Sequence, residues 1–331
     1  MKRLPALFFT IILFSCTTHQ YKTIGNIERD DTALDAIISP EAKIEIIAEG
    51  FKWSEGPVWL DDKKTLIFSD IPNNTIFKWT EEKGIEVYLK PSGYTGTVPR
   101  GGELGSNGLL LNKDGKLILC QHGNRQMAMM DAPIDNPKPV FKPIANNYNG
   151  KKFNSPNDAV YRSNGDLFFT DPPYGLEKNM DDTLKEIPFQ SVYRVSTNGD
   201  VKLLVDTITR PNGIAFLPGD KTLIIANSDT TNPVWYRFDV DANDSLINPG
   251  IFYDATDAAK KDGGNPDGLK VDSKGNVYAA GPGGVWIFNA SGKLLGKIKF
   301  PGKLANCTLT KDEKTLFIAA DDKVLRVVMR R

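Results

Sequence analysis

The sequence predicts an all-β protein, a six-bladed β-propeller whose last blade is closed by an N-terminal strand. Two observations lead to this prediction: six similar hairpins follow one another along the chain, and each begins with a residue that carries a side-chain oxygen. Successive heads are 52, 50, 55, 55 and 39 residues apart, a period that suits a four-stranded blade. The six heads are Glu55, Asn107, Asn157, Asn212, Asp267 and Asn306.

Each hairpin repeats one pattern, for example "NGIAFLPGDKTLIIAN" from Asn212. An alternating apolar strand follows the head, a turn rich in Asp, Gly, Lys or Asn comes next, and a second apolar strand completes the hairpin. Further strand-like runs lie between the hairpins and would form the outer strands of the blades. They include residues 75–79, 191–195, 234–238 and 284–288.

The last unit has room for about three strands before the chain ends. We expect "KIEIIA" at 43–48 to supply its outer strand, because closing the ring removes exposed sheet edges. A two-sheet sandwich or two unrelated β-domains is the alternative, and six copies with equivalent turns disfavour it. No composition break follows residue 40, so residues 41–331 are predicted to form a single propeller domain.

The N-terminus has the layout of an export signal. Two basic residues precede an apolar run over 4–14, which is too short to span a bilayer. "LFSC" resembles a bacterial lipobox, so residues 1–16 are predicted to be a lipoprotein-type signal peptide with Cys16 lipidated; an ordinary cleaved signal is the alternative. Residues 17–40 are polar and are predicted to be a flexible tether. The protein would then be lipid-anchored on the periplasmic side of a bacterial cell envelope.

The charge balance and the cysteine content limit the binding partners and the cross-links that we expect. Lys plus Arg and Asp plus Glu number 41 each, so no net field attracts nucleic acid, and none is expected as a partner. Contact with a membrane is expected only through the N-terminal anchor, and the propeller is expected to be a monomer or a weak dimer. Cys120 and Cys307 fall on blades that are not neighbours, which predicts two buried free thiols.

The heads also predict a metal site on the axis of the propeller. The innermost strands line the central channel, so residues at equivalent starts form a ring on one face. Two carboxylates and several amide carbonyls suit Ca²⁺ better than Zn²⁺. His19 and His122 are the only histidines, which excludes a multi-histidine zinc site. The alternative is that these Asn and Asp side chains make Asx turns to nearby backbone with no metal present.

Four motifs in order, "EGPVW", "SPND" with "FTDPPYG", "PNGIAF" and "PDGLKVD", resemble the senescence-marker-protein/gluconolactonase family from about residue 45 to the end. The resemblance implies a sugar lactonase with one divalent cation, usually Ca²⁺, with Zn²⁺, Mn²⁺ or Mg²⁺ also possible. Carried over motif by motif, Glu55, Asn212 and Asp267 would bind the cation, with Asn157 as fourth ligand or substrate contact. These are four of the six heads.

The hypothesis for the reaction is that a sugar (aldono-) lactone such as gluconolactone is hydrolysed by water, with Asp267 as general base; direct attack by Asp267 is the rival assignment. Specificity would come from loops on the same face. Candidate substrate-binding residues are Asn107, His122, Arg125 and Tyr174. Asp171 is predicted to orient Asn157 by a hydrogen bond.

One departure from the family pattern concerns the sugar. Some members carry an arginine where this chain has Ser155, so the resemblance does not fix which lactone is used. Two other functions stay open. A related propeller, diisopropyl fluorophosphatase, hydrolyses phosphotriesters with the same kind of oxygen ligands, so a phosphotriesterase or esterase is possible. A non-catalytic sugar-binding lipoprotein is the third reading.

Overall fold

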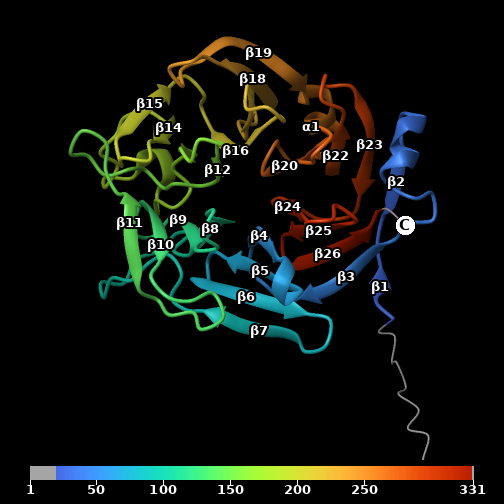
Figure 1. Cartoon of the computed structure of the whole chain (residues 1–331), viewed down its shortest axis with the longest axis horizontal. Helices are drawn as coiled ribbons and strands as arrows, with labels where there is room; N and C mark the ends of the chain where they lie inside the picture. Colours follow the sequence, from blue (N-terminus) through green and yellow to red (C-terminus); the bar gives the residue numbers. More distant parts are fainter. Residues whose placement is uncertain (1–19, 330–331) are drawn as a thin grey trace, which may run out of the picture.

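Six antiparallel sheets form a ring in the computed structural model, which describes residues 20–329 (Figure 1). The predicted six-bladed β-propeller is confirmed. We number the blades 1 to 6 in chain order of their innermost strands, β4, β8, β12, β16, β20 and β24, which contact one another around the axis.

The first three blades have four strands each. Blade 1 consists of β4 (Ser54–Leu60), β5 (Thr65–Asp70), β6 (Thr75–Thr80) and β7 (Gly84–Leu89). Blade 2 consists of β8 (Ser106–Leu111), β9 (Leu117–Gln121), β10 (Gln126–Met130) and β11 (Phe141–Ala145). Blade 3 consists of β12 (Ala159–Tyr161), β13 (Leu167–Asp171), β14 (Ser191–Val195) and β15 (Val201–Val205).

The last two blades take strands from the N-terminal segment. Blade 4 consists of β16 (Pro211–Phe216), β17 (Thr222–Asn227), β18 (Val234–Val240) and β19 (Leu246–Asp254). Blade 5 consists of β20 (Leu269–Val271), β21 (Val277–Gly281), β22 (Gly284–Phe288), β23 (Leu294–Lys299) and β2 (Asn26–Arg29). Blade 6 consists of β24 (Asn306–Leu309), β25 (Thr315–Ala320), β26 (Lys323–Val328), β3 (Ile44–Glu49) and β1 (Lys22–Thr23).

The ring closes through β3, as the sequence predicts. This strand pairs antiparallel with β26, with Glu49 opposite Lys323 and Ile44 opposite Val327. The two strands come from opposite ends of the chain, so their ladder joins the first and last parts of the sequence in one sheet. Closure completes blade 6, so that the innermost strand of each blade contacts those of its two neighbours around the axis.

The prediction of a flexible tether is wrong for residues 20–40. Strand β1 extends blade 6 by pairing with β3, and β2 forms a fifth strand on blade 5 against β23. Between these strands and β3, the 3₁₀ turn η1 (Thr32–Ala36) is capped by Asp31, whose Oδ1 accepts a hydrogen bond from Ala33 N at 2.8 Å. Residues 20–40 contain too few apolar side chains to show a period in the sequence. These side chains become buried because they pack against the outer edges of blades 5 and 6.

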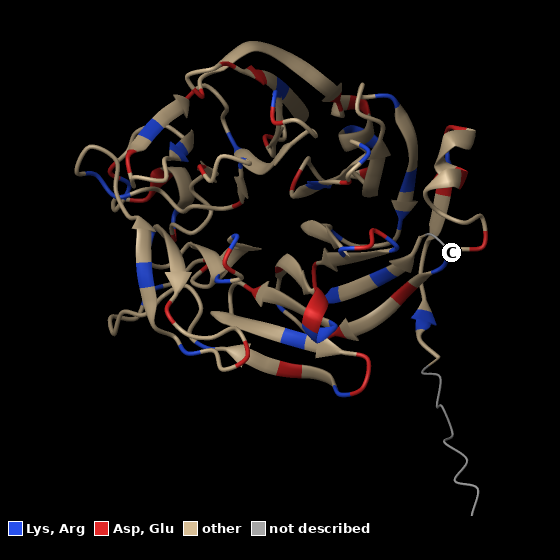
Figure 2. Ribbon diagram, viewed as in Figure 1, with Lys and Arg blue, Asp and Glu red and all other residues tan. Residues whose placement is uncertain are grey.

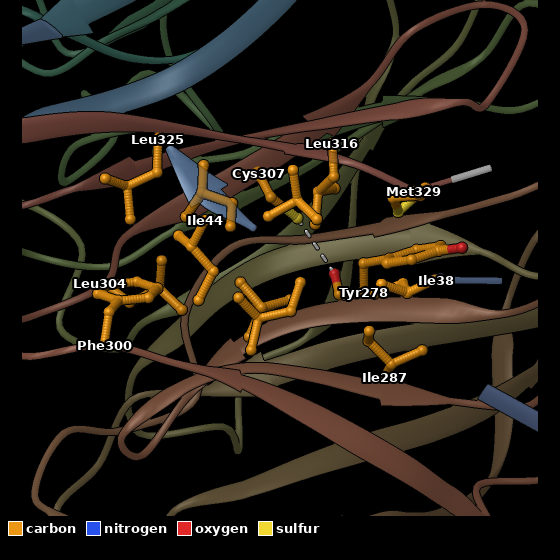
Figure 3. Close-up of a cluster of buried hydrophobic side chains, with 14 of the residues drawn as sticks. Ile38, Ile44, Tyr278, Ile287, Phe300, Leu304, Cys307, Leu316, Leu325 and Met329 are labelled. Atoms are coloured by element: carbon orange, nitrogen blue, oxygen red, sulfur yellow. Dashed lines mark hydrogen bonds between the residues drawn. The ribbon is translucent and has the colours of Figure 1, made fainter. Parts of the chain in front are cut away.

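The N-terminal segment packs into a hydrophobic cluster between blades 5 and 6 (Figure 3). Leu34 and Ile38 of the N-terminal segment are fully buried beside Ile44, Tyr278 and Ile287. Burying a side chain of this size stabilises the fold by about 1.5–3 kcal/mol. The segment is therefore part of the folded propeller.

Both remaining cysteines are free and buried, as expected. Burial raises the pKa of the Cys120 thiol well above its usual value and that of Cys307 to about 12. The Cys307 Sγ lies 3.4 Å from the Tyr278 carbonyl oxygen (Figure 3). Neither thiol is poised to form the reactive thiolate.

The other elements are short turns and one helix. They are η2 (Asp61–Lys63), η3 (Asn179–Asp181) and α1 (Thr256–Asp262). Among residues 20–329, no helix has the length and apolar character needed to cross a membrane. Basic and acidic side chains are interspersed around the ring, consistent with the equal charge counts (Figure 2).

Candidate active site

Five of the six heads line one cavity of about 580 Å³ at the end of the propeller axis. Each stands at or just before the start of an innermost strand, where the chain enters its blade. The five are Glu55, Asn107, Asn157, Asn212 and Asp267. The predicted cation ligands are thus brought together, from blades 1, 3, 4 and 5.

A glycine after the head brings neighbouring blades close together. A Cβ atom on Gly56 would lie 2.2 Å from the Asn107 carbonyl oxygen, and one on Gly213 would lie 2.4 Å from that of Asp267. Both distances are shorter than any ordinary contact, so a larger residue would push the blades apart. The pair of head and glycine therefore places one polar side chain beside the next around the axis.

Four buried oxygens in this cavity have no hydrogen-bond donor among the residues that the structure describes. They are Oδ1 of Asn107, Asn157, Asn212 and Asp267. The Asn212 amide is held from its other side, since Nδ2 donates to Ser228 Oγ at 3.0 Å. Leaving a buried acceptor unpaired costs about 1–3 kcal/mol, so four at one place indicate a ligand that accepts their lone pairs. This donor set fits a hard cation.

Two carboxyl groups of the cavity, Glu55 and Asp267, have raised pKa values. Burial raises the pKa of the Asp267 carboxyl well above its usual range, and the nearby Glu55 and Asp158 carboxylates raise it further. Burial is also the main cause of the raised pKa of Glu55, with Asp158 adding to it. A cation between these groups would favour their ionised forms. Within residues 20–329, no three His, Cys, Asp or Glu side chains are placed to bind a metal, so amide oxygens must complete any such site.

The sixth head, Asn306, is absent from the cavity lining and is buried against Glu55 and Asp158. Its Nδ2 donates to Glu55 Oε2 at 3.1 Å and approaches Asp158 Oδ2 at 3.4 Å. Lys270 Nζ completes this group at 3.7 Å from Asp158 Oδ2 and 3.4 Å from Asn306 Oδ1. We call Asn306, Asp158 and Lys270 the channel network. Asn306 of this network donates a hydrogen bond to Glu55, and the Lys270 ammonium group supplies one positive charge near the buried carboxylates of Glu55 and Asp158.

Asp171 does not hydrogen-bond to the Asn157 side chain, in contrast to the prediction. Its two carboxylate oxygens accept hydrogen bonds from the backbone N–H groups of Asn154 and Ser155, both at 2.8 Å. Burial raises its pKa to about 7. Asp171 therefore fixes the backbone that leads to Asn157, and its effect on the head is indirect.

Two of the four predicted substrate contacts line the cavity, and two do not. Asn107 and Tyr174 are part of its wall. The prediction is not supported for Arg125, whose Nε donates to the Phe153 carbonyl at 2.6 Å and Nη1 to that of Leu184 at 2.8 Å. His122 is fully buried and outside the lining. His122 follows the end of β9, and the connection between blades 1 and 2 lies between it and the cavity, because Glu103 of that connection lines the cavity and contacts His122.

Sequence reasoning missed several residues that the cavity or the channel network contains. Trp53, Glu103, Ser228 and Lys303 line the cavity. Trp53, Glu103 and Lys303 lie in connections between blades and Ser228 in the loop between β17 and β18 of blade 4, where no periodicity marks a position. Asp158 had a signal: it follows its head in "SPND" at the place where four other heads have glycine.

The fold and the site define a class of protein: a closed six-bladed propeller with an oxygen-lined cavity at one end of its axis. The chain belongs to the SMP-30/gluconolactonase/LRE-like family, whose model matches residues 53–321. It is 38% identical to a gluconolactonase of Zymomonas mobilis over 311 residues, 92% of this chain and 86% of the relative.

Two solved structures share the architecture. A gluconolactonase from Xanthomonas campestris superposes with a TM-score of 0.79 at 26% identity, over 95% of this chain and all of the other. An X-ray structure assigned as a gluconolactonase has the same TM-score at 27% identity, over 92% of this chain and 98% of its own. The likeness therefore extends over nearly the whole propeller.

Proposed function

We propose that this protein hydrolyses an aldonolactone such as D-glucono-1,5-lactone in a reaction that depends on a divalent cation. As a member of its family the chain is a hydrolase acting on ester bonds, and its characterised relatives are named for lactone hydrolysis. One observation carries the proposal: unpaired, buried oxygens of Asn157, Asn212 and Asp267 converge on a cavity that also contains Glu55.

Glu55, Asn157, Asn212 and Asp267 are the residues that would hold the cation. Their all-oxygen set favours Ca²⁺, with Zn²⁺, Mn²⁺ and Mg²⁺ as the alternatives to test. When bound, the cation would act as a Lewis acid toward the lactone carbonyl.

Asp267 is the residue proposed to move the proton. Its ionised carboxylate would remove a proton from the water that attacks the carbonyl carbon. The ring C–O bond would then break, and the proton on Asp267 would pass to the leaving ring oxygen. The product is a hydroxy acid, which releases its carboxyl proton to solvent and becomes the anion. Attack on the carbonyl by Asp267 itself is the rival route, and a single turnover in ¹⁸O-labelled water separates the two. Label found in the Asp267 carboxylate would exclude the general-base route.

The decisive experiment follows lactone hydrolysis by proton release before and after treatment with a chelator. We expect the chelator to abolish turnover of D-glucono-1,5-lactone and one added cation to restore it. Full turnover by protein shown to be free of metal would contradict the cation dependence.

A panel of lactones, a phosphotriester and a simple ester tests the substrate. Turnover of the phosphotriester or the ester alone would favour one of the alternative hydrolases. Sugar binding with no turnover of any of these compounds, with metal bound, would favour a binding lipoprotein. Either result would overturn the lactonase proposal.

Export and anchoring are proposed separately, because residues 1–19 lie outside the described part of the chain. We propose that Cys16 is lipidated and holds the propeller on the periplasmic side of the envelope, as a monomer or a weak dimer. Membrane fractionation of wild type and Cys16→Ala tests this: the variant should leave the membrane fraction. A variant that stays there would contradict anchoring through Cys16.

A further inference from the structure

Besides Glu55 and Asp267, two carboxylates line the cavity: Asp262, which pairs with Lys299, and Glu103, from the connection between blades 1 and 2. Glu103 lines the same space as Glu55 and Asp267, and its side chain is 34% exposed. None of the steps proposed above uses it. Its position raises the question of what it binds.

The connection that carries Glu103 is fixed to its surroundings. Arg100 donates from Nη2 to the Gly175 carbonyl at 2.5 Å and from Nη1 to the Gly123 carbonyl at 3.2 Å. Gly123 packs so closely that a Cβ atom on it would lie 2.4 Å from the Leu104 carbonyl oxygen. Glu103 is therefore presented by a segment tied to blades 2 and 3.

His122 lies directly behind Glu103. It follows β9, is fully buried, and places Nδ1 3.2 Å from Glu103 Oε2. The two atoms are close enough to interact electrostatically, but they are not aligned as a hydrogen bond. Glu103 is the only carboxylate in the described part of the chain that lies within ion-pair distance of this imidazole.

The Glu103 carboxylate thus keeps its capacity to accept hydrogen bonds. No donor among residues 20–329 makes an aligned hydrogen bond to it. A carboxylate accepts hydrogen bonds at both oxygens, and hydroxyl groups are the neutral donors that satisfy it. A ligand that carries its own negative charge would be repelled.

We propose that Glu103 determines specificity by binding the hydroxyl groups of a neutral, polyhydroxylated lactone. In this proposal His122 is a positioning residue that holds the carboxylate from behind. The inference rests on the proposed lactonase function and adds to it the feature of the substrate that the cavity recognises.

The test compares two lactones with the same six-membered ring, D-glucono-1,5-lactone and unsubstituted δ-valerolactone. Glu103→Gln keeps the shape of the side chain and removes its charge. It should raise KM for the hydroxylated lactone about tenfold, with kcat within about twofold, because hydrogen bonds to an ionised acceptor are the stronger ones. KM and kcat for δ-valerolactone should change less than about twofold.

Glu177→Gln is the matched control. Glu177 is an exposed carboxylate near the same connection, where it accepts from Gly101 N at 3.3 Å, and it does not line the cavity. This variant should leave KM and kcat unchanged for both lactones.

A second pair of variants tests the positioning role. His122→Leu removes the ring nitrogens at similar volume and should raise KM for the hydroxylated lactone in the same direction. His122→Asn places an amide nitrogen near the position of Nδ1 and should restore KM. Cation affinity, measured by calorimetry, should be unchanged in Glu103→Gln, which separates a substrate effect from damage to the cation site.

The outcomes are distinguishable. If wild type hydrolyses both lactones and Glu103→Gln leaves the ratio of their kcat/KM values unchanged, the inference is overturned while the lactonase proposal stands. If wild type hydrolyses neither lactone with cation bound, the proposed function is contradicted and the inference falls with it.

Discussion

Asn212 and Asn306 occupy the same position in two blades, and the structure puts them to different use. The Asn212 carbonyl oxygen is buried in the cavity with no donor in the described residues. Asn306 lies outside the cavity lining, and its amide donates to Glu55 while its carbonyl oxygen accepts from the Cys307 backbone N–H at 2.9 Å. Position in the repeat therefore brings a side chain to the axis, but its neighbours decide whether it stabilises the fold or remains available to a ligand.

The cavity and the channel network also differ in whether their carboxylates have a nearby positive charge. Glu55 and Asp267 lie at the cavity, whereas the Asp158 carboxylate lies 3.7 Å from Lys270 Nζ. Among residues 20–329, neither Glu55 nor Asp267 has a lysine or arginine within ion-pair distance, although Lys303 also lines the cavity. Four predictions would break or sharpen this comparison.

The largest effect is expected for Asp267→Asn. Loss of the proposed base should lower kcat for gluconolactone by about 10²- to 10⁴-fold while the protein stays folded, because general-base catalysis contributes on that order. Stopped-flow or pH-stat kinetics with circular dichroism would measure both. Asp257→Asn, on the exposed surface of α1, is the control. Retained turnover in Asp267→Asn would remove Asp267 from the reaction.

The next effect is a dependence of stability on pH in chelator-treated protein. The pKa of Glu55 rises from 4.5 to about 8 on folding, so between these values the native state holds a proton that the unfolded state has released. The contribution of Glu55 to stability should therefore be fully present at and below pH 4.5 and be lost as pH rises toward 8, by about 2–4 kcal/mol. Asp171, whose pKa is raised to about 7, changes stability in the same direction.

Urea unfolding at pH 5 and pH 8 measures this dependence. Added Ca²⁺ at pH 8 should restore the stability, because a bound cation favours the ionised carboxylates. Glu55→Gln should reduce the slope. Equal midpoints at both pH values for the chelator-treated wild type would contradict the electrostatic account of the cavity.

Asn306→Ala should destabilise the fold by about 1–3 kcal/mol, since Glu55 and Asp158 would lose a buried hydrogen-bond donor. Thermal or urea unfolding of chelator-treated protein measures the loss. A change of less than about 0.5 kcal/mol would show that the channel network is not structural.

Asn212→Ala should have the smallest effect on that same stability, within about 0.5 kcal/mol. It removes the hydrogen bond from Nδ2 to Ser228 Oγ, but it also removes a buried oxygen that has no donor in the described residues, and the two effects oppose each other. The same unfolding experiment measures it, in parallel with Asn306→Ala. If Asn212→Ala were the more destabilising of the two, the distinction between cavity and channel would be wrong.

The sequence predicts most of the fold because a propeller repeats its signals. The hairpin pattern from Asn212 and its five counterparts identifies the blades, and the strand over 43–48 is recognised because one blade lacks it. The prediction of a flexible tether is wrong for residues 20–40, because the burial of Leu34 and Ile38 depends on outer edges of blades that are distant in the chain. A segment with no period of its own gives no local sign of such packing.

The candidate site shows the same division. The heads are predicted because they occupy one position of the repeat. Glu103 lies in an irregular connection, and His122 follows a strand whose end is covered by that connection. The position of Arg125 just after a strand end predicts a place in the cavity wall, but its guanidinium donates to backbone carbonyls of the next blade. These orientations depend on how loops of different blades meet.

Direct calorimetric titration of Ca²⁺ into chelator-treated protein tests the central claim, that the cavity heads bind a cation. The account predicts one ion per chain in wild type, an affinity at least about tenfold weaker in Asn212→Ala, and no measurable binding in Asp267→Asn. Binding that neither substitution changes, or no binding of Ca²⁺, Zn²⁺, Mn²⁺ or Mg²⁺ to the wild type, would contradict it.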